Sequence, residues 1–289
     1  MSMTPATAEN SAILIRDIDG PAELRAVEAL QKEVWGLPDL DVVPFTQLVA
    51  ARAAGGTLVG AFDGETMVGF AYGFAAYERG RLAHHSHMLA VLPAYRNHNL
   101  GHRLKLAQRE RVVAQGCTLM SWTFDPLQSL NAHFNFNKLG VVADRYLVNF
   151  YGEDAPSFLH RNGTDRLWVT WPLTGRRVRE RLGGRAHAPE PADVTPLLQL
   201  GLDDSPLRNS PAAALARAQG LIEIPADIGD LERRGGGLAN AWREATRWAF
   251  TEALAAGYLV TGFVRPNRDA RRAGGYLLDR GERLRDLFG

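Results

Sequence analysis

The pattern of hydrophobic and polar positions predicts alternating strands and helices over residues 13–172. Leu24 and Val27 begin a repeat with helical spacing after a turn that contains proline. Asp63 and Gly64 separate two apolar runs, and this dipeptide predicts an antiparallel hairpin. The remaining pattern predicts strands at 13–17, 57–62, 66–77, 117–124 and 166–171, a strand that ends at Leu92, one or two strands before Tyr151, and helices within 24–34, 45–54, 99–115 and 127–138. This order of elements predicts an α/β (mixed α+β) domain with a central sheet flanked by helices.

The composition changes after residue 174, which predicts a boundary between domains. Residues 175–196 are rich in Arg, Gly and Pro and have little apolar periodicity, so an exposed linker is expected. Beyond it the order of strand, helix and strand occurs again, at 221–225, 238–257 and 258–266. A duplication and convergence on a common βαβ unit both explain this repeat. The prediction is therefore a domain over 1–174, the linker, and a C-terminal α/β half domain over 197–289 that packs on the first.

Composition and charge exclude several classes of protein. The chain has 289 residues, 46% of them hydrophobic and 22% charged, and its net charge of +1 gives no overall attraction to nucleic acid or membrane. The single cysteine, Cys117, excludes an internal disulfide and is expected in the core, and no Cys/His group has the spacing of metal ligands. No apolar run approaches the roughly 20 residues of a membrane span, and the first ten residues do not resemble a signal peptide. We therefore expect a cytoplasmic protein with no metal, membrane or nucleic-acid partner.

Residues 91–101, VLPAYRNHNLG, connect a strand to the start of a helix. The first amides of a helix lack partners and lie at the positive end of the helix dipole, so such a turn is suited to binding a pyrophosphate. This segment resembles the acyl-CoA signature of the GNAT family of N-acetyltransferases, in which Arg or Gln is followed by two residues of any kind, Gly, any residue, and Gly or Ala. Arg96, Asn99 and Gly101 occupy those places. Asn99 departs from the glycine, but asparagine is the next most tolerant of positive φ.

A second segment, SLNAHFNFNKLGV at residues 129–141, resembles the family's helix that ends in an aromatic residue, Lys, Leu, Gly and an apolar residue. In the family this helix diverges from the preceding strand and leaves a slot for pantetheine. The resemblance implies a GNAT-like fold with a mixed, mostly antiparallel sheet, and acetyl-CoA or another acyl-CoA as co-substrate. The residues that it implies for binding the cofactor are Leu89, Val91, Arg96, Asn97, His98, Asn99, Leu100, Gly101, His102, Ser129, Asn131 and Phe136.

Histidines cluster on the strand that precedes the turn. Residues two apart on a strand share a face, and the residues therefore expected on one face are His85, His87, Leu89 and Val91. Imidazole titrates near neutral pH and can accept a proton from an ammonium substrate. Serotonin N-acetyltransferases, which belong to the same family, have a histidine pair on this strand, and the resemblance makes His85 and His87 the candidate general bases. The alternative is that these histidines are hydrogen-bonded inside the sheet or exposed at its end.

A general acid is not evident. Many members of the family have a tyrosine four residues before the glycine of KLG, where this chain has Phe136, which cannot donate a proton. Tyr146 and Tyr151 are candidates only if the following strand returns toward the slot, and Tyr146 is the one we predict. A thiolate with a pKa of about 8.5 leaves without strong help, so direct attack by a neutral amine does not require the acid. In that mechanism the backbone amides of Leu89 and Val91 stabilise the acyl oxygen.

The favoured function is a CoA-dependent N-acyltransferase that transfers an acetyl or succinyl group to a primary amine of a small molecule or an amino acid. The alternative is a non-catalytic acyl-CoA-binding regulatory module, motivated by Asn99 and Phe136, which would bind CoA without releasing thiol. Nucleic-acid binding through the Arg-rich segments is disfavoured by the near-zero net charge. The C-terminal residues considered for an acceptor pocket are Glu223, Asp227 and Arg265. The oligomeric state, including a homodimer, is left open.

Overall fold

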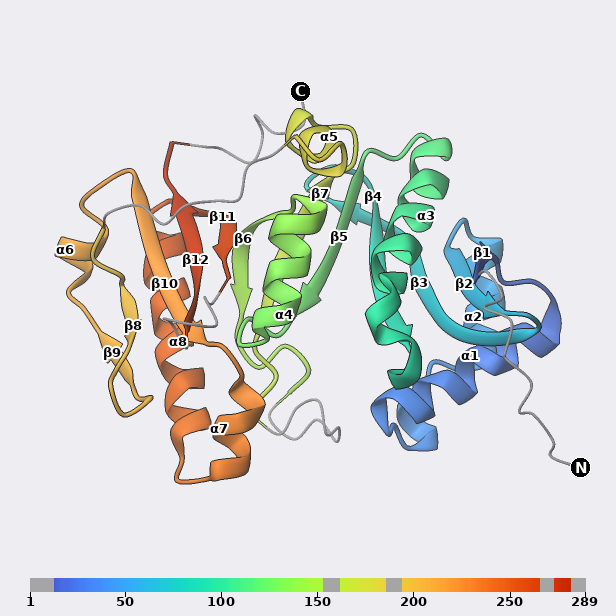
Figure 1. Cartoon of the computed structure of the whole chain (residues 1–289). Coiled ribbons are helices and arrows are strands. Elements are labelled where there is room, and N and C mark those ends of the chain that lie inside the picture. Colours follow the sequence, from blue (N-terminus) through green and yellow to red (C-terminus); the bar gives the residue numbers. More distant parts are fainter. Residues whose placement is uncertain (1–12, 153–161, 186–193, 266–272, 282–289) are drawn as a thin grey trace, which may run out of the picture. The chain divides into compact units, whose positions relative to one another are not determined.

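The computed structural model describes residues 13–152, 162–185, 194–265 and 273–281, which form two compact units (Figure 1). The first unit comprises the described residues up to Gly80 together with His84–Gly116, and the second comprises Arg81–Ala83 and the described residues from Cys117 onward. The strands and helices confirm the predicted mixed α/β fold, with mostly antiparallel pairing. The domain boundaries predicted at 174 and 197 stay a prediction.

The sheet of the first unit has the order β1, β2, β3, β4. These strands are β1 (Leu14–Asp17), β2 (Thr57–Asp63), β3 (Thr66–Glu78) and β4 (Arg81–Val91), the last belonging to this unit from His84 onward. The predicted hairpin is confirmed, because Asp63 pairs with Thr66 and Gly64 adopts a positive φ of 58°. The amide of Leu92 donates to the carbonyl of Val68 at 2.9 Å, which holds the end of β4 against β3.

Helices cover both faces of this sheet. The helices α1 (Gly20–Trp35) and α2 (Phe45–Ala53), joined through the short η1 (Asp39–Asp41), cover one face, and α3 (Leu100–Ala114) covers the other. The apolar stripe predicted for α1 is confirmed, since Leu24, Val27 and Leu30 are buried. Two separate hydrophobic clusters follow, one against α1 and α2 and one against α3. Each residue of β3 and β4 can therefore be assigned to a face.

The sheet of the second unit has the order β5, β7, β6, β11, β12, β10, β8, β9. Its strands are β5 (Leu119–Phe124), β6 (Val142–Leu147), β7 (Arg166–Pro172), β8 (Leu198–Leu200), β9 (Pro206–Arg208), β10 (Gln219–Pro225), β11 (Leu259–Val264) and β12 (Ala273–Asp279). The helices are α4 (Ser129–Ala132), which continues as the π-helix η3 (His133–Leu139), α5 (Arg176–Leu182), α6 (Pro211–Ala214), α7 (Ile228–Arg234) and α8 (Leu238–Ala255). None of the helices within the described ranges has the length and apolar content that crossing a bilayer requires.

The C-terminal strands differ from the predicted strand, helix, strand repeat. The sequence pattern missed β12, which pairs antiparallel with both β10 and β11 and lies between them. Val260 of β11 also pairs with Ala143 of β6, so strands from before and after the Arg-rich segment belong to one sheet. The C-terminal strands thus extend the sheet that begins with β5.

The Arg-rich segment begins with a helix, where an exposed connection was expected. Val178 of α5 is buried, and Arg177 donates a hydrogen bond to the carbonyl of Thr261. A seven-residue helix with one buried apolar side chain has no visible periodicity, which is why the pattern did not reveal it. Residues 186–193 of the predicted linker lie outside the described residues.

Candidate functional site

The turn between β4 and α3 has the backbone conformation that the motif implies. Pro93–His98 form a single 3₁₀ segment, η2, and Asn99 follows in the left-handed region with φ 56° and ψ 20°. This confirms the expectation that the fourth position of the motif, where Asn99 replaces glycine, has a positive φ, which asparagine tolerates better than most residues. The side chain of Asn99 does not cap the helix. The amides of the first turn of α3 therefore donate no hydrogen bond to the side chain of Asn99.

The first turn of α3 is open to a ligand. The amide of Arg103 donates to the carbonyl of Asn99 at 3.1 Å, and the amides of Leu100, Gly101 and His102 precede this first helical bond. A Cβ added at Gly101 would meet only Leu89 Cδ2, at 3.7 Å. Neither backbone conformation nor internal packing thus requires a glycine at position 101. Its missing side chain instead leaves the positive end of the helix accessible.

Neighbouring side chains hold this turn in place and make it basic. The hydroxyl of Tyr95 donates to Asp63 Oδ2 at 2.9 Å, and this bond raises the pKa of Tyr95. Arg96 Nε donates to the carbonyl of Val91 at 3.3 Å, while most of its guanidinium remains exposed, as does His98. The side chain of Asn97, another predicted cofactor residue, lies outside the described part of the structure. The turn is thus anchored to the β2–β3 hairpin and presents the side chains of Arg96 and His98 to solvent.

The histidine pair, His85 and His87, lies on the opposite face of β4 from Leu89 and Val91, with which it was predicted to share a face. The rings of His85 and His87 lie 5.3 and 5.6 Å from the ring of Phe74, on the face covered by α1 and α2. Leu89 and Val91 instead pack in the cluster against α3. The prediction that all four residues share one face is therefore wrong. The cause is a local break in the alternation of side chains between His87 and Met88, as a β-bulge produces.

The histidine pair sits among aromatic rings. Its members lie 6.2 Å apart, centre to centre, and His87 also makes an edge contact with Tyr72 at 6.0 Å. His85 is half-buried, whereas His87 is exposed at one edge. The protein atoms packed around His87 nevertheless lower its pKa below the usual 6.5 by desolvating the imidazolium. Near neutral pH this side chain is therefore a neutral imidazole that can accept a proton.

His84 and Ser86 face α3 and belong to a buried hydrogen-bond chain. Lys105 Nζ donates to Ser86 Oγ at 2.6 Å, and Ser86 Oγ donates to Gln108 Oε1 at 2.7 Å. Gln108 Nε2 donates to Thr57 Oγ1 at 3.0 Å, and Thr57 Oγ1 lies 2.9 Å from His84 Nε2. Thr57 Oγ1, which accepts from Gln108, still has its own proton and can donate it to His84 Nε2 in the tautomer that leaves this nitrogen unprotonated. This chain joins β4 to α3.

Lys105 is buried, although lysine side chains usually lie exposed at the surface. Only 2% of the residue is exposed, and burial lowers its pKa to about 7. Burial, together with the positive charge of Lys105, lowers the pKa of His84 to about 4. His84 is thus a neutral histidine whose role is structural. The candidate bases are the two residues that point the other way.

Gly73 is required by this arrangement. A Cβ at Gly73 would lie 2.4 Å from His84 Nε2 and 2.7 Å from the carbonyl oxygen of His85. We expect Gly73→Ala to lower the free energy of unfolding by about 1–3 kcal/mol, because β3 and β4 must move apart. Gly101→Ala is the control in a denaturant titration, since its new methyl group has space. Equal stability of the two variants would contradict the close packing at Gly73.

The predicted cofactor residues of the second unit have different surroundings. Ser129 is buried at the start of α4, and Asn131 is exposed. Phe136 is fully buried, with its ring 6.4 Å from that of Phe124 and 5.8 Å from that of Tyr276. Phe136 thus forms part of an aromatic core next to the end of β5. The role of these three residues in binding the cofactor stays a prediction.

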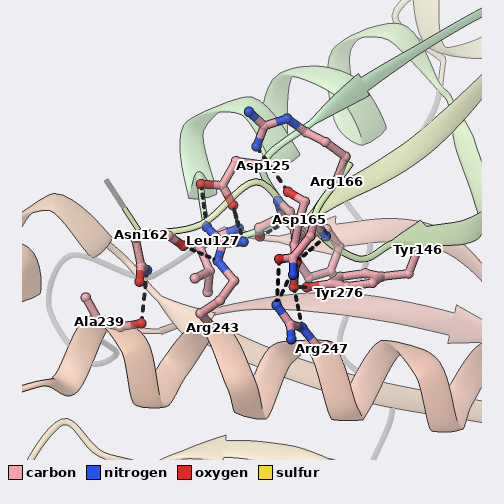
Figure 2. Close-up of polar contacts among 12 residues, drawn as sticks. Asp125, Leu127, Tyr146, Asn162, Asp165, Arg166, Ala239, Arg243, Arg247 and Tyr276 are labelled. Atoms are coloured by element: carbon pink, nitrogen blue, oxygen red, sulfur yellow. Dashed lines mark hydrogen bonds and ion pairs between the residues drawn. The ribbon is translucent and has the colours of Figure 1, made fainter. Parts of the chain in front are cut away.

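Tyr146, the predicted general acid, already has a hydrogen-bond partner. Its hydroxyl donates to Asp165 Oδ2 at 2.8 Å (Figure 2). Its ring stacks on that of Phe250, with 5.4 Å between the ring centres. Burial, with the negative charge of Asp165, raises the pKa of Tyr146 well above its usual value. The catalytic role of Tyr146 stays a prediction. Its contacts show that it also orients a buried carboxylate.

A buried cluster of charged side chains, missed by the sequence analysis, surrounds this carboxylate (Figure 2). Asp125 accepts bonds of 2.8 and 2.9 Å from Arg243, and Asp165 accepts bonds of 2.9 and 3.0 Å from Arg247. Arg166 donates to the backbone carbonyl of Asp165 at 3.0 Å. The pairs join the ends of β5 and β7 to α8. No local pattern reveals them, because the paired residues are 118 and 82 positions apart.

The residues considered for an acceptor pocket make structural contacts. Glu223 Oε2 accepts the amide of Leu200 at 3.0 Å, and Asp227 caps α7 by accepting the amide of Asp230 at 3.2 Å. Arg265 is exposed. A role of these residues in binding an acceptor stays a prediction. Within the described residues no group of three His, Cys, Asp or Glu side chains is placed to bind a metal.

The comparison with protein families gives one match. Residues 23–140 match the acetyltransferase (GNAT) family, a span that runs from α1 through the turn at Asn99 to the end of η3. Both motifs quoted from the sequence end within or one residue beyond this span. No curated protein sequence matches the chain.

Solved structures of acetyltransferases are similar to part of the chain. The ribosomal-protein-S18-alanine N-acetyltransferase from Escherichia coli is 13% identical, with a TM-score of 0.44 over 56% of this chain and 94% of its own. The aminoglycoside 6'-N-acetyltransferase from Enterococcus faecium is 19% identical, with a TM-score of 0.42 over 56% and 98%. A GNAT family acetyltransferase from Elizabethkingia anophelis with acetyl-CoA bound is 14% identical, with a TM-score of 0.41 over 57% and 99%.

Proposed function

We propose that this chain, whose residues 23–140 form a GNAT-family acetyltransferase domain, transfers an acetyl or succinyl group from acyl-CoA to a primary amine of a small molecule or an amino acid. Acetyl-CoA is the co-substrate of the family. The observation that supports the proposal most is the left-handed Asn99 before the open first turn of α3. That turn has the geometry that an anion such as a diphosphate needs.

The diphosphate of CoA would bind at the start of α3. The amides of Leu100, Gly101 and His102 would donate to the phosphate oxygens at the positive end of the helix dipole. Arg96 and His98 are exposed beside them and would neutralise part of the phosphate charge. Ser129, Asn131 and Phe136 are the residues that we assign to the pantetheine arm.

The acyl group would be attacked directly by the amine. The amides of Leu89 and Val91 are assigned to the acyl oxygen, whose negative charge grows as the amine nitrogen bonds to the carbonyl carbon. The proton of the amine passes to His87 or His85, the bond from carbon to sulfur breaks, and CoA leaves as a thiolate. Tyr146 is assigned as the donor that protonates this thiolate, directly or through water. The products are an amide and free CoA.

The base assignment predicts a pH profile. Because the pKa of His87 is lowered from 6.5, its neutral form persists below pH 6.5, and activity should fall only as the pH drops through that lowered pKa. His87→Gln is expected to reduce kcat about 100-fold and to remove this acidic limb of the profile. The measurement is kcat as a function of pH.

Two further variants control this experiment. His85→Gln tests the second candidate base on the same face, and His133→Gln, on η3, makes the same chemical change at a histidine to which the mechanism assigns no role. The assignment predicts that His133→Gln keeps the wild-type profile. If His85→Gln and His87→Gln both keep the wild-type rate and profile, neither histidine is the base.

The proposed function is tested by release of free thiol from acetyl-CoA and succinyl-CoA with a panel of amines and amino acids. Thiol release that depends on the added amine, together with the acylated product found by mass spectrometry, supports the proposal. CoA binding without thiol release from any amine would instead indicate the regulatory module.

A further inference from the structure

The buried charged cluster of the second unit contains more positive than negative groups. Its guanidinium groups belong to Arg166, Arg243 and Arg247, and its carboxylates belong to Asp125 and Asp165. Each carboxylate accepts two bonds from one arginine, Asp125 from Arg243 and Asp165 from Arg247. Within each pair the positive and the negative charge cancel, so the charge of Arg166 remains.

The hydrogen-bond partners of Arg166 are neutral groups. Only 7% of the residue is exposed, and its polar contacts are the backbone carbonyl of Asp165 and a hydrogen bond with the side chain of Tyr151, whose ring centre lies 5.3 Å from the guanidinium carbon. It has no ion pair with any carboxylate in the described part of the chain. Figure 2 shows its guanidinium on the opposite side of Asp165 from Arg247. Burial lowers the pKa of Arg166, and the nearby negative charge of Asp125, which is already paired with Arg243, offsets this only in part.

The position of Arg166 relates it to the end of β5. Leu167 pairs with Phe124, so Arg166, one residue earlier on β7, lies level with Asp125, the first residue after β5. Phe124 also contacts Phe136, which we assign to the pantetheine arm. Arg166 is therefore a buried cation beside the end of β5, one strand position from Phe124, which contacts the proposed pantetheine residue Phe136.

We propose that Arg166 binds a carboxylate group of a substrate. A guanidinium forms two parallel hydrogen bonds with a carboxylate, and in a buried place this pair is favoured over any neutral partner. The inference rests on the proposed function and narrows its substrate class. The carboxylate has two sources, the distal end of a succinyl donor or the α-carboxylate of an amino-acid acceptor.

The test measures four substrate pairs with the full-length enzyme. Acetyl-CoA and succinyl-CoA are each combined with the most active amino acid of the panel and with its carboxamide. The wild type is expected to have a KM about 10- to 100-fold lower for whichever substrate has the carboxylate that Arg166 binds, and Arg166→Gln is expected to abolish this difference. A preference for succinyl-CoA identifies the donor, and a preference for the free acid over the carboxamide identifies the acceptor.

Three variants separate recognition from a structural role. Arg166→Lys keeps the charge and is expected to retain part of the preference, while Arg176→Gln removes an exposed arginine and is expected to retain all of it. If Arg166→Gln reduces turnover of all four pairs equally, the residue is structural and the proposal is wrong. If Arg166→Gln does not fold, the wild type alone decides, because a wild type that prefers neither carboxylate contradicts the proposal.

A binding measurement separates this inference from the proposed function. Succinate is expected to raise the melting temperature of the wild type and of Arg176→Gln, and to have no such effect on Arg166→Gln. If succinate stabilises the wild type but no amine releases thiol, the carboxylate site is supported and the proposed acyl transfer is wrong. If thiol is released but succinate has no effect and no carboxylate substrate is preferred, acyl transfer is supported and the carboxylate site is wrong.

Discussion

Asp125→Asn is expected to lower the free energy of unfolding by about 3–5 kcal/mol, the cost of removing one partner from a buried ion pair. The side chains of Asp125 and Arg243 are 14% and 6% exposed. Asparagine keeps an oxygen for the amide of Leu127, which Asp125 Oδ1 accepts at 3.0 Å, so the substitution mainly removes charge. Arg243 would then lose its ion-pair partner, and Arg166 would lose the nearby negative charge of Asp125. Denaturant titration monitored by circular dichroism measures the change.

The control for this prediction is an exposed ion pair in the same unit. Arg176 and Glu180 lie 3.8 Å apart on α5 and are 85% and 45% exposed. Glu180→Gln makes the same change of charge and is expected to alter stability by less than about 0.5 kcal/mol. If Asp125→Asn were as mild as Glu180→Gln, the pair with Arg243 would not hold α8 to the end of β5.

Gly101→Glu is expected to weaken acetyl-CoA binding by about 100-fold or more without destabilising the protein. A carboxylate in the first turn of α3 interacts favourably with the helix dipole, and the new side chain has room, since only Leu89 Cδ2 lies near its Cβ position. The same carboxylate would occupy the place of the diphosphate and repel it. Isothermal titration calorimetry with acetyl-CoA measures the affinity, and thermal unfolding measures the stability.

Ala114→Glu provides the matched control on the same helix. It adds the same charge at the last residue of α3, where the side chain is exposed. This variant is expected to bind acetyl-CoA with the wild-type affinity. Loss of binding in both variants would indicate a general effect of charge on α3, and unchanged binding in Gly101→Glu would contradict a phosphate site at the helix start.

Local features of the structure could be predicted from the sequence. The hairpin at Gly64, the buried stripe of α1 and the positive φ of Asn99 each depend on residues within a few positions of one another. The residue preferences of turns and the periodicity of helices can both be recognised within such short segments. The turn that forms the candidate phosphate site was predictable for the same reason.

Features that depend on distant residues could not be predicted. The alternation of side chains along a regular strand predicted that the histidine pair shares a face with Leu89. A break in this alternation, as a β-bulge produces, cannot be read from the sequence pattern. Lys105 is buried beside Ser86 of another element, which accepts its hydrogen bond. Arg243 finds Asp125 across 118 residues, and no spacing in the sequence relates them. The roles of these charged groups therefore emerged only from the structure.

The most direct test of the central claim is the chemical shift of the backbone amides at the start of α3, measured by ¹⁵N NMR during titration with CoA and, separately, with pantetheine. The account predicts that CoA shifts the amide resonances of Leu100, Gly101 and His102, and that pantetheine, which lacks the diphosphate, leaves them in place. CoA binding that leaves these three resonances unchanged would contradict it.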